Sequence, residues 1–268
     1  MLVLKNATLA TTEQLFRYKN QGFSLEKFSF PGYTTDQWGI KAHNRPWVEE
    51  AGEFSSGQKI IEVGGAYSLF PKYLASKHNG LEAWSGDDFG EYLGEENMWS
   101  RWGNPMDLPN KHPQIKYVFE PFGQYSEKYP TSYFDRIFSI STLEHIPKEH
   151  RLDVFKDMNR CLKAGGMQLH TIDISTNWKR VLFHSLTDLA PKLMLKINEK
   201  AISEIRHWVD TIAQSGVKIK TPIPNTLSLF NRKLLVESPD VVYRFYPPNN
   251  SPKLYSPSAS LLVVIEDV

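Results

Sequence analysis

Short apolar runs alternate with amphipathic stretches through the middle of the chain. The clearest run covers residues 59–63, Lys-Ile-Ile-Glu-Val, and it ends at Gly64 and Gly65. A continuous run rich in β-branched residues is typical of a buried parallel strand, and a helical pattern begins soon after the glycines, at Leu69. We therefore predict a strand, a tight glycine turn and a helix. Paired glycines let a backbone approach a ligand closely, although an ordinary strand-to-helix loop has the same pattern.

The same alternation continues along the chain. Further strands are expected at residues 81–85, 115–119, 134–141, 167–172, 217–219 and 261–265, and amphipathic helices at 147–162 and 202–212. Strands that alternate with helices predict an α/β fold. We expect a doubly wound, mainly parallel seven-stranded sheet with helices on both faces and ligands at the carboxyl ends of its strands.

Two segments stand apart from this alternation. Residues 1–56 are expected to form an N-terminal helical cap, with a helix at 11–20 that Thr11 or Thr12 caps, and with its aromatic residues packed on the sheet. The main domain would then cover residues 57–268 and carry a proline-rich insertion near 221–259. Such an insertion shapes a pocket or merely connects two elements, and both readings stay open.

Composition and charge limit the classes of molecule that this chain is expected to bind. The chain has 268 residues, 41% of them hydrophobic, which is enough for a full core, and its formal net charge of +1 creates no field that would attract nucleic acid. Its single cysteine, Cys161, allows no intramolecular disulfide. No leader peptide and no membrane-spanning run is evident in the sequence. We expect a soluble, cytoplasmic protein whose partner is a small molecule rather than a nucleic acid or a membrane.

A pair of acidic residues follows the strand expected at 81–85. Asp87 and Asp88 lie roughly 20 residues after the glycines, where a doubly wound sheet presents a carboxylate to the ribose of a nucleotide. We assign that role to Asp88, which precedes the apolar Phe89, and interpret Asp87 as part of a solvated turn.

At this point the motifs resemble those of the class I S-adenosylmethionine-dependent methyltransferases. The glycine motif reads E-V-G-G-A-Y-S, in which Glu62 and Gly64 match the family and Ala66 and Ser68 replace its later glycines. The string F-D-R-I-F-S-I-S-T-L-E-H-I-P is similar to the family's fourth-strand signature, and L-K-A-G-G is similar to its Leu-Lys-Pro-Gly-Gly turn. The resemblance extends from residue 59 to about residue 174.

The resemblance implies a cofactor, S-adenosyl-L-methionine, and a set of residues around it. Asp88 would bind the ribose hydroxyls, Glu120 would lie near the adenine amino group, and Phe122 would cover the adenine ring. The full set implied for the cofactor is Glu62, Gly64, Gly65, Ala66, Asp88, Glu120, Phe122 and Ser141.

The implied reaction is methyl transfer to an oxygen or nitrogen of a small molecule. His145 is the candidate general base, because the unperturbed pKa of histidine is near 6.5, and Asp173 is a second candidate at the end of a strand. For His145 a structural role in the turn, and for Asp173 a capping role, are equally open. Some relatives bind a divalent ion through Glu-x-x-Glu-His, but Ser141 replaces the first carboxylate here, so we predict no metal.

Other readings remain. A nicotinamide-dependent oxidoreductase would need a glycine where this chain has Leu69, which disfavours that class. A non-catalytic member of the same fold that binds a cofactor or a partner is fully compatible with the sequence. His170 is interpreted as a core histidine, His43 shows no neighbouring pattern, and the oligomeric state is open.

Overall fold

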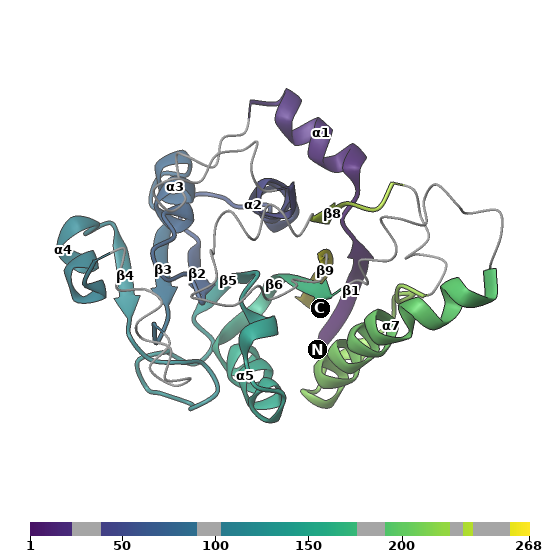
Figure 1. Ribbon diagram of the computed structural model, residues 1–268. Helices are drawn as coiled ribbons and strands as arrows, with labels where there is room; N and C mark the ends of the chain where they lie inside the picture. Colours follow the sequence, from purple (N-terminus) through teal and green to yellow (C-terminus); the bar gives the residue numbers. More distant parts are fainter. Residues whose placement is uncertain (23–38, 90–102, 176–190, 226–232, 238–257) are drawn as a thin grey trace.

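The computed structural model describes residues 1–22, 39–89, 103–175, 191–225, 233–237 and 258–268 (Figure 1). Its sheet has nine strands, two more than the seven predicted. They are β1 (Leu2–Leu9), β2 (Lys59–Val63), β3 (Glu82–Gly86), β4 (Ile115–Val118), β5 (Phe134–Ile140), β6 (Leu162–Ser175), β7 (Lys218–Ile219), β8 (Val236–Glu237) and β9 (Ser258–Asp267). The order across the sheet is β4-β3-β2-β5-β6-β9-β1-β7, and β8 pairs with β9.

The half of the sheet from β4 to β6 is parallel throughout. Its strands lie where the apolar runs predict them, and the central strands β2 and β5 are buried along most of their length, as is typical of parallel strands covered on both faces. β9 joins the other side of β6 in an antiparallel direction. The predicted fold, a mainly parallel α/β sheet, is confirmed.

The first strand was not predicted. β1 inserts between β9 and β7, antiparallel to the former and parallel to the latter, whereas residues 1–56 were expected to be a helical cap. A register shift between Leu4 and Asn6 interrupts the alternation of this strand and hides it from a local pattern. Helices do follow it, so the expected cap is only partly helical. The domain division near residue 56 stays a prediction.

Helices cover both faces of the sheet (Figure 1). They are α1 (Thr12–Asn20), α2 (Gly39–Gly52), α3 (Phe70–Lys77), α4 (Leu108–Lys111), α5 (Lys148–Cys161) and α7 (Pro191–Gln214), together with 3₁₀ turns at Pro105–Asp107 and Leu143–His145. α1, α2 and α3 pack with one face in a shared apolar cluster. α5 and α7 pack with the other face. The carboxyl ends of the parallel strands emerge between these two layers.

Several smaller expectations can be checked. Thr11 caps α1 through a reciprocal pair of hydrogen bonds with Gln14, as predicted for one of the two threonines. His170 is a core histidine, held between Ser139 and Gln168, and burial lowers its pKa to about 3. The insertion predicted near 221–259 lies largely outside the described residues. In the part of the chain that the structure describes, no helix is long and apolar enough to cross a bilayer.

Candidate functional site

The glycine turn after β2 is the centre of the candidate site. Gly64 has a φ of +71°, and a Cβ there would lie 1.9 Å from the Thr142 Cγ2 atom, so only glycine fits. The turn is tied to both neighbouring strands. The Gly64 amide donates to the Gly86 carbonyl at 2.8 Å, and the Thr142 hydroxyl donates to the Gly64 carbonyl at 3.1 Å. The predicted turn therefore lies against the ends of β3 and β5.

Asp87 holds this turn in place, which corrects its interpretation as a solvated residue. Its Oδ2 accepts the Ala66 amide at 2.7 Å, and its Oδ1 accepts the Phe89 amide at 2.6 Å. Ala66 and Phe89 both have positive φ angles, a region that non-glycine residues rarely adopt. Burial raises the pKa of Asp87 to about 7, although both backbone hydrogen bonds act in the opposite direction. The carboxyl group thus stabilises two strained backbone positions at once.

Glu62, the last acidic residue of β2, lies fully inside the protein. Its side chain is 2% exposed, and burial raises its pKa to about 7. Two neighbours oppose that shift, the positive charge of Arg45 and a hydrogen bond from Ser68. Arg45 comes from α2 and is itself buried. The site therefore contains a buried acidic side chain and a buried basic side chain next to the glycine turn.

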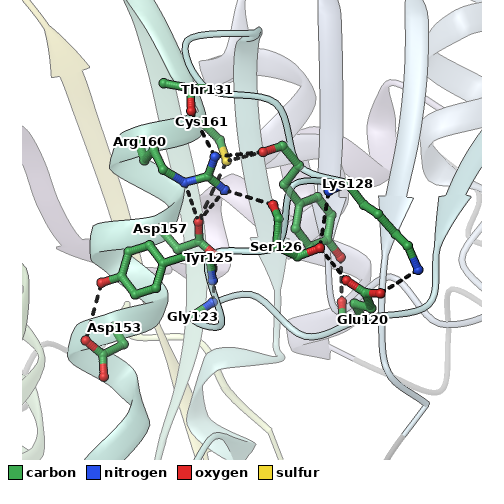
Figure 2. A network of polar contacts seen from close by, with 11 residues as sticks. Glu120, Gly123, Tyr125, Ser126, Lys128, Thr131, Asp153, Asp157, Arg160 and Cys161 are labelled. Carbon is green, nitrogen blue, oxygen red and sulfur yellow. Dashed lines mark hydrogen bonds and ion pairs between the residues drawn. The ribbon is translucent and has the colours of Figure 1, made fainter.

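The two residues predicted for the adenine, Glu120 and Phe122, lie in the loop after β4, and each has a partner within that loop. The Glu120 carboxylate forms an ion pair with the Lys128 Nζ atom at 2.5 Å and accepts a hydrogen bond from the Ser126 hydroxyl (Figure 2). These hydrogen bonds hold the pKa of Glu120 below its usual range. Phe122 is buried and stacks on Tyr129, with ring centroids 4.1 Å apart. In this structure both side chains contact their own loop.

That loop is braced by α5. The Asp157 Oδ2 atom accepts the backbone amides of Gly123 and Tyr125, at 2.9 and 3.2 Å (Figure 2). Arg160 pairs with Asp157 at 2.7 Å and donates to the Tyr129 carbonyl at 2.8 Å. Contacts with Asp157 and Arg160 of α5 therefore hold the loop after β4 in position.

Ser141 and Asp173 meet at the ends of β5 and β6. The Ser141 hydroxyl donates to the Asp173 Oδ1 atom at 3.1 Å and accepts a hydrogen bond from the Asn44 amide at 3.2 Å. Ser141 has a φ of +50°, so its backbone is held in a rare conformation. The structure thus brings one residue predicted for the cofactor into direct contact with one predicted for catalysis, and a third residue, Asn44 of α2, bonds to Ser141.

His145 lies in the 3₁₀ turn that follows β5. Its side chain is 73% exposed, and its Nε2 atom is 3.9 Å from Glu144 Oε1. The backbone amide of His145 donates to the Thr142 carbonyl at 3.0 Å, which closes the turn through main-chain atoms. The imidazole therefore lies at the surface.

Sequence reasoning missed the contribution of α2. His43, Asn44 and Arg45 are consecutive, polar and buried. His43 contacts Gln14 of α1 and the Asn44 side chain, each at 3.3 Å, and burial lowers its pKa to about 4. A signal did exist. Asn44 precedes Trp47 by three residues and Val48 by four, which places it on the same helical face as two apolar residues.

The remaining predicted residues lie as follows. Asp88 is half-buried at the end of β3, directly after Asp87 and close to the glycine turn. Gly65 passes over Ser85, since a Cβ on Gly65 would lie 2.6 Å from the Ser85 hydroxyl. Among the described residues, no three His, Cys, Asp or Glu side chains are grouped so that they could hold a metal ion.

The chain was compared with known protein families, with curated sequences and with solved structures. No family sequence model matches the chain, and no curated protein sequence matches it. Solved structures do match. Phosphoethanolamine N-methyltransferase 2 of Haemonchus contortus, in complex with S-adenosyl-L-methionine, has a TM-score of 0.51 at 15% identity over 83% of this chain and 52% of that chain. This chain therefore spans about half the length of that protein.

Two further structures align over more of their own length. They are a candidate methyltransferase from Bacillus halodurans (TM-score 0.44, 12% identity, 84% of this chain and 98% of that chain) and a candidate sarcosine dimethylglycine methyltransferase from Galdieria sulphuraria (TM-score 0.43, 14% identity, 85% and 86%). The similarity to the Haemonchus protein is the one that supports the fold assignment. The chain has the fold of the class I S-adenosylmethionine-dependent methyltransferases, as its motifs predict.

Proposed function

We propose that the protein binds S-adenosylmethionine and transfers its methyl group to an oxygen or nitrogen of a small molecule. The observation that carries the proposal is the glycine turn with a buried Glu62 and Arg45 beside it. In a doubly wound sheet, ligands bind at the carboxyl ends of the strands, where this turn lies.

The residues around the turn fit the amino-acid end of that cofactor. An α-amino acid carries an ammonium and a carboxylate group, and Glu62 and Arg45 offer one charge of each sign. Gly64 has a backbone conformation that only glycine adopts without strain, which keeps the turn narrow. Asp88 remains the residue proposed for the ribose hydroxyls, and Gly65 and Ala66 would contribute the backbone of the turn. When bound, the cofactor supplies a methyl group on a positively charged sulfur.

The residues predicted for the adenine of the cofactor would have to exchange their present contacts to bind it. The Glu120 carboxylate would have to exchange Lys128 or Ser126 for the adenine amino group, since both contact it now. Phe122 would have to leave Tyr129 before its ring could cover a base.

The acceptor side is proposed at Ser141 and Asp173. A carboxylate at a strand end accepts a hydrogen bond from an acceptor hydroxyl or amine, and the hydrogen bond from Ser141 fixes the orientation of Asp173. The methyl group on the positively charged sulfur is already reactive. Correct orientation of the acceptor therefore accounts for a large part of the rate of methyl transfer. His145 stays a candidate base, because an exposed turn next to a site can close over a bound acceptor.

Titration calorimetry tests cofactor binding directly. S-adenosylhomocysteine and NADH are titrated into the protein and into its Asp88→Ala and Arg45→Met variants. We expect binding of S-adenosylhomocysteine only, weakened by about 1–3 kcal/mol in each variant, since a charged hydrogen-bonding partner is lost. Lys156→Ala, at an exposed position of α5, is the control and should bind like the wild type. Binding of NADH alone would refute the proposal.

Catalysis needs a separate measurement. The protein is incubated with methyl-labelled S-adenosylmethionine and a panel of small amines, phenols and alcohols, and label in the acceptor is counted. Transfer to any acceptor that Asp173→Asn abolishes supports the proposed reaction. Tight cofactor binding without transfer to any acceptor would instead favour the non-catalytic reading of the same fold.

A further inference from the structure

Three polar side chains lie side by side on neighbouring strands beneath the glycine turn. The sheet register pairs Glu62 of β2 with Ser85 of β3, and Ser85 with Tyr117 of β4. Register partners in a parallel sheet project from the same face, and neighbouring strands are roughly 4.8 Å apart. We call these three residues the polar row.

Each member of the polar row has an oxygen atom that lacks a partner. Glu62 Oε2, Ser85 Oγ and Tyr117 Oη are buried and have no hydrogen bond within the part of the chain that the structure describes. Glu62 and Ser85 are only 2% and 1% exposed. Burying a polar atom without a hydrogen bond costs free energy, and native proteins rarely do so. Three such atoms on adjacent strands point to one shared partner.

Gly65 packs closely over the polar row. A Cβ on Gly65 would lie 2.6 Å from Ser85 Oγ and 3.2 Å from Glu62 Cγ, so any larger residue would press on both side chains. Gly65 has an ordinary φ, so backbone strain does not demand a glycine there. The glycine at this position lets the backbone pass over Ser85 and Glu62 without displacing either side chain.

We propose that Glu62, Ser85 and Tyr117 together bind an ordered water molecule under the glycine turn. The chemistry of the three groups selects water. Two hydroxyl groups need acceptors and one carboxyl oxygen needs a donor, and a water molecule accepts two hydrogen bonds and donates two. An ammonium group has three donors and no acceptor, so it would leave both hydroxyl protons without a partner.

Electrostatics supports the donor role of the tyrosine. Burial raises the pKa of Tyr117, and the charge of Glu62 raises it further, so the phenol keeps its proton. The water would then link the outer strand β4 to the acidic residue of the turn. The inference does not depend on the proposed methyl transfer, since it concerns the unliganded protein.

Thermal unfolding of Ser85→Ala and Tyr117→Phe tests the site. If water bridges the polar row, each deletion removes one of its hydrogen bonds, and we expect the melting temperature to fall by about 2–4 °C. Deleting a hydroxyl that has no partner at all removes a buried polar group, so an unchanged or higher melting temperature in both variants would overturn the proposal.

Ser260→Ala is the matched control. Ser260 lies on β9, is fully buried, and also has a hydroxyl without a partner in the described residues, but it is outside the polar row. We expect its melting temperature to equal or exceed that of the wild type. The two row variants should fall below the control.

A crystal structure of the unliganded protein gives an independent readout. Electron density for a water molecule within about 2.7–3.2 Å of the three oxygens supports the proposal, and its loss in the Tyr117→Phe variant strengthens it. A direct hydrogen bond between the side chains with no density between them would overturn it. A second crystal with S-adenosylhomocysteine separates water from a ligand amino group at the same place, and an amino group found there would also overturn the assignment to water.

Discussion

Asp87 Oδ2 accepts the backbone amide of Ala66 at 2.7 Å, and through this hydrogen bond the end of β3 holds the turn at the end of β2. Ala66 has a φ of +43°, a conformation that costs free energy for a residue with a Cβ. The carboxylate therefore compensates for the absence of a glycine at this position. At Ala66, one of the two positions where the motif departs from its family, the geometry is kept through a neighbour that follows the next strand.

Asp87→Ala should destabilise the fold by about 1–3 kcal/mol, because the amides of Ala66 and Phe89 lose their acceptor. Denaturant unfolding measures this. Asp88→Ala, which leaves the acceptor of these two amides in place, is the matched control and should cost less stability than Asp87→Ala. Equal losses in both variants would contradict the assignment of the turn to Asp87. A companion variant, Ala66→Gly, should raise the stability of Asp87→Ala, since glycine relieves the strained φ.

The pKa of Glu62 predicts a pH effect on stability. Burial raises it from 4.5 to about 7, so the folded state keeps a proton that the unfolded chain releases between these values. Its contribution to stability is therefore fully present below about pH 4.5 and is lost as the pH rises to about 7. Glu62→Gln mimics the protonated form. The free energy of unfolding of the wild type minus that of the variant should decrease across this window.

Taking the difference between the two proteins removes the titration of other groups. Asp87 titrates in a similar range, and Arg45 lies close to Glu62, but both are present in wild type and variant. Denaturant unfolding at pH 5 and pH 8 is sufficient. A difference that does not decrease between these two pH values would mean that Arg45 holds Glu62 ionised.

His145→Gln should leave the stability unchanged within about 0.5 kcal/mol, because the imidazole is 73% exposed and the turn is closed by backbone atoms. Thermal unfolding measures this without any substrate. Once an acceptor is found, a base role predicts a loss of turnover of about 10²–10⁴-fold with unchanged cofactor affinity. A fall in stability above about 1 kcal/mol would restore the alternative in which this side chain holds the turn.

Asn44 and Ser141 should be energetically coupled. Asn44→Ala removes a buried donor to the Ser141 hydroxyl and should cost about 1–3 kcal/mol. In a double-mutant cycle with Ser141→Ala, the coupling should be about 0.5–3 kcal/mol, as for residues in contact. The control cycle pairs Asn44→Ala with Thr131→Ala, in the loop that α5 braces, and should be additive. Additivity in both cycles would show that α2 does not support the strand ends.

The central strands could be predicted from the sequence because β2 and β5 are largely buried, which makes apolar residues dominate both runs. β1 could not. Its alternation is interrupted after Leu4, and its partner strand lies at Ser258–Asp267, so only a tertiary contact defines it. The length of β6 was also underestimated, since residues beyond 172 pair with β9 rather than with a parallel neighbour.

The site was predicted where local chemistry is explicit. Gly64 was recognisable, because its place in the motif demands a positive φ, which the structure confirms. Asp87 and Asp88 are adjacent and chemically identical, and only the structure shows which of them accepts the amide of Ala66. Asn44 and Arg45 lie far from the motif in sequence, so their contact with it depends on how α2 packs.

The pairing of β1 with β9 also affects how this protein folds during synthesis. Their register runs from Leu2 with Asp267 to Leu9 with Leu261, so contacts span nearly the whole sequence. Contacts of such separation slow folding, since a long loop must close before they form. During synthesis the first strand emerges early and has no main partner until residues 258–267 leave the ribosome. Until then β1 presents an unpaired strand edge. Such edges are prone to aggregation and are a kind of surface that chaperones shield.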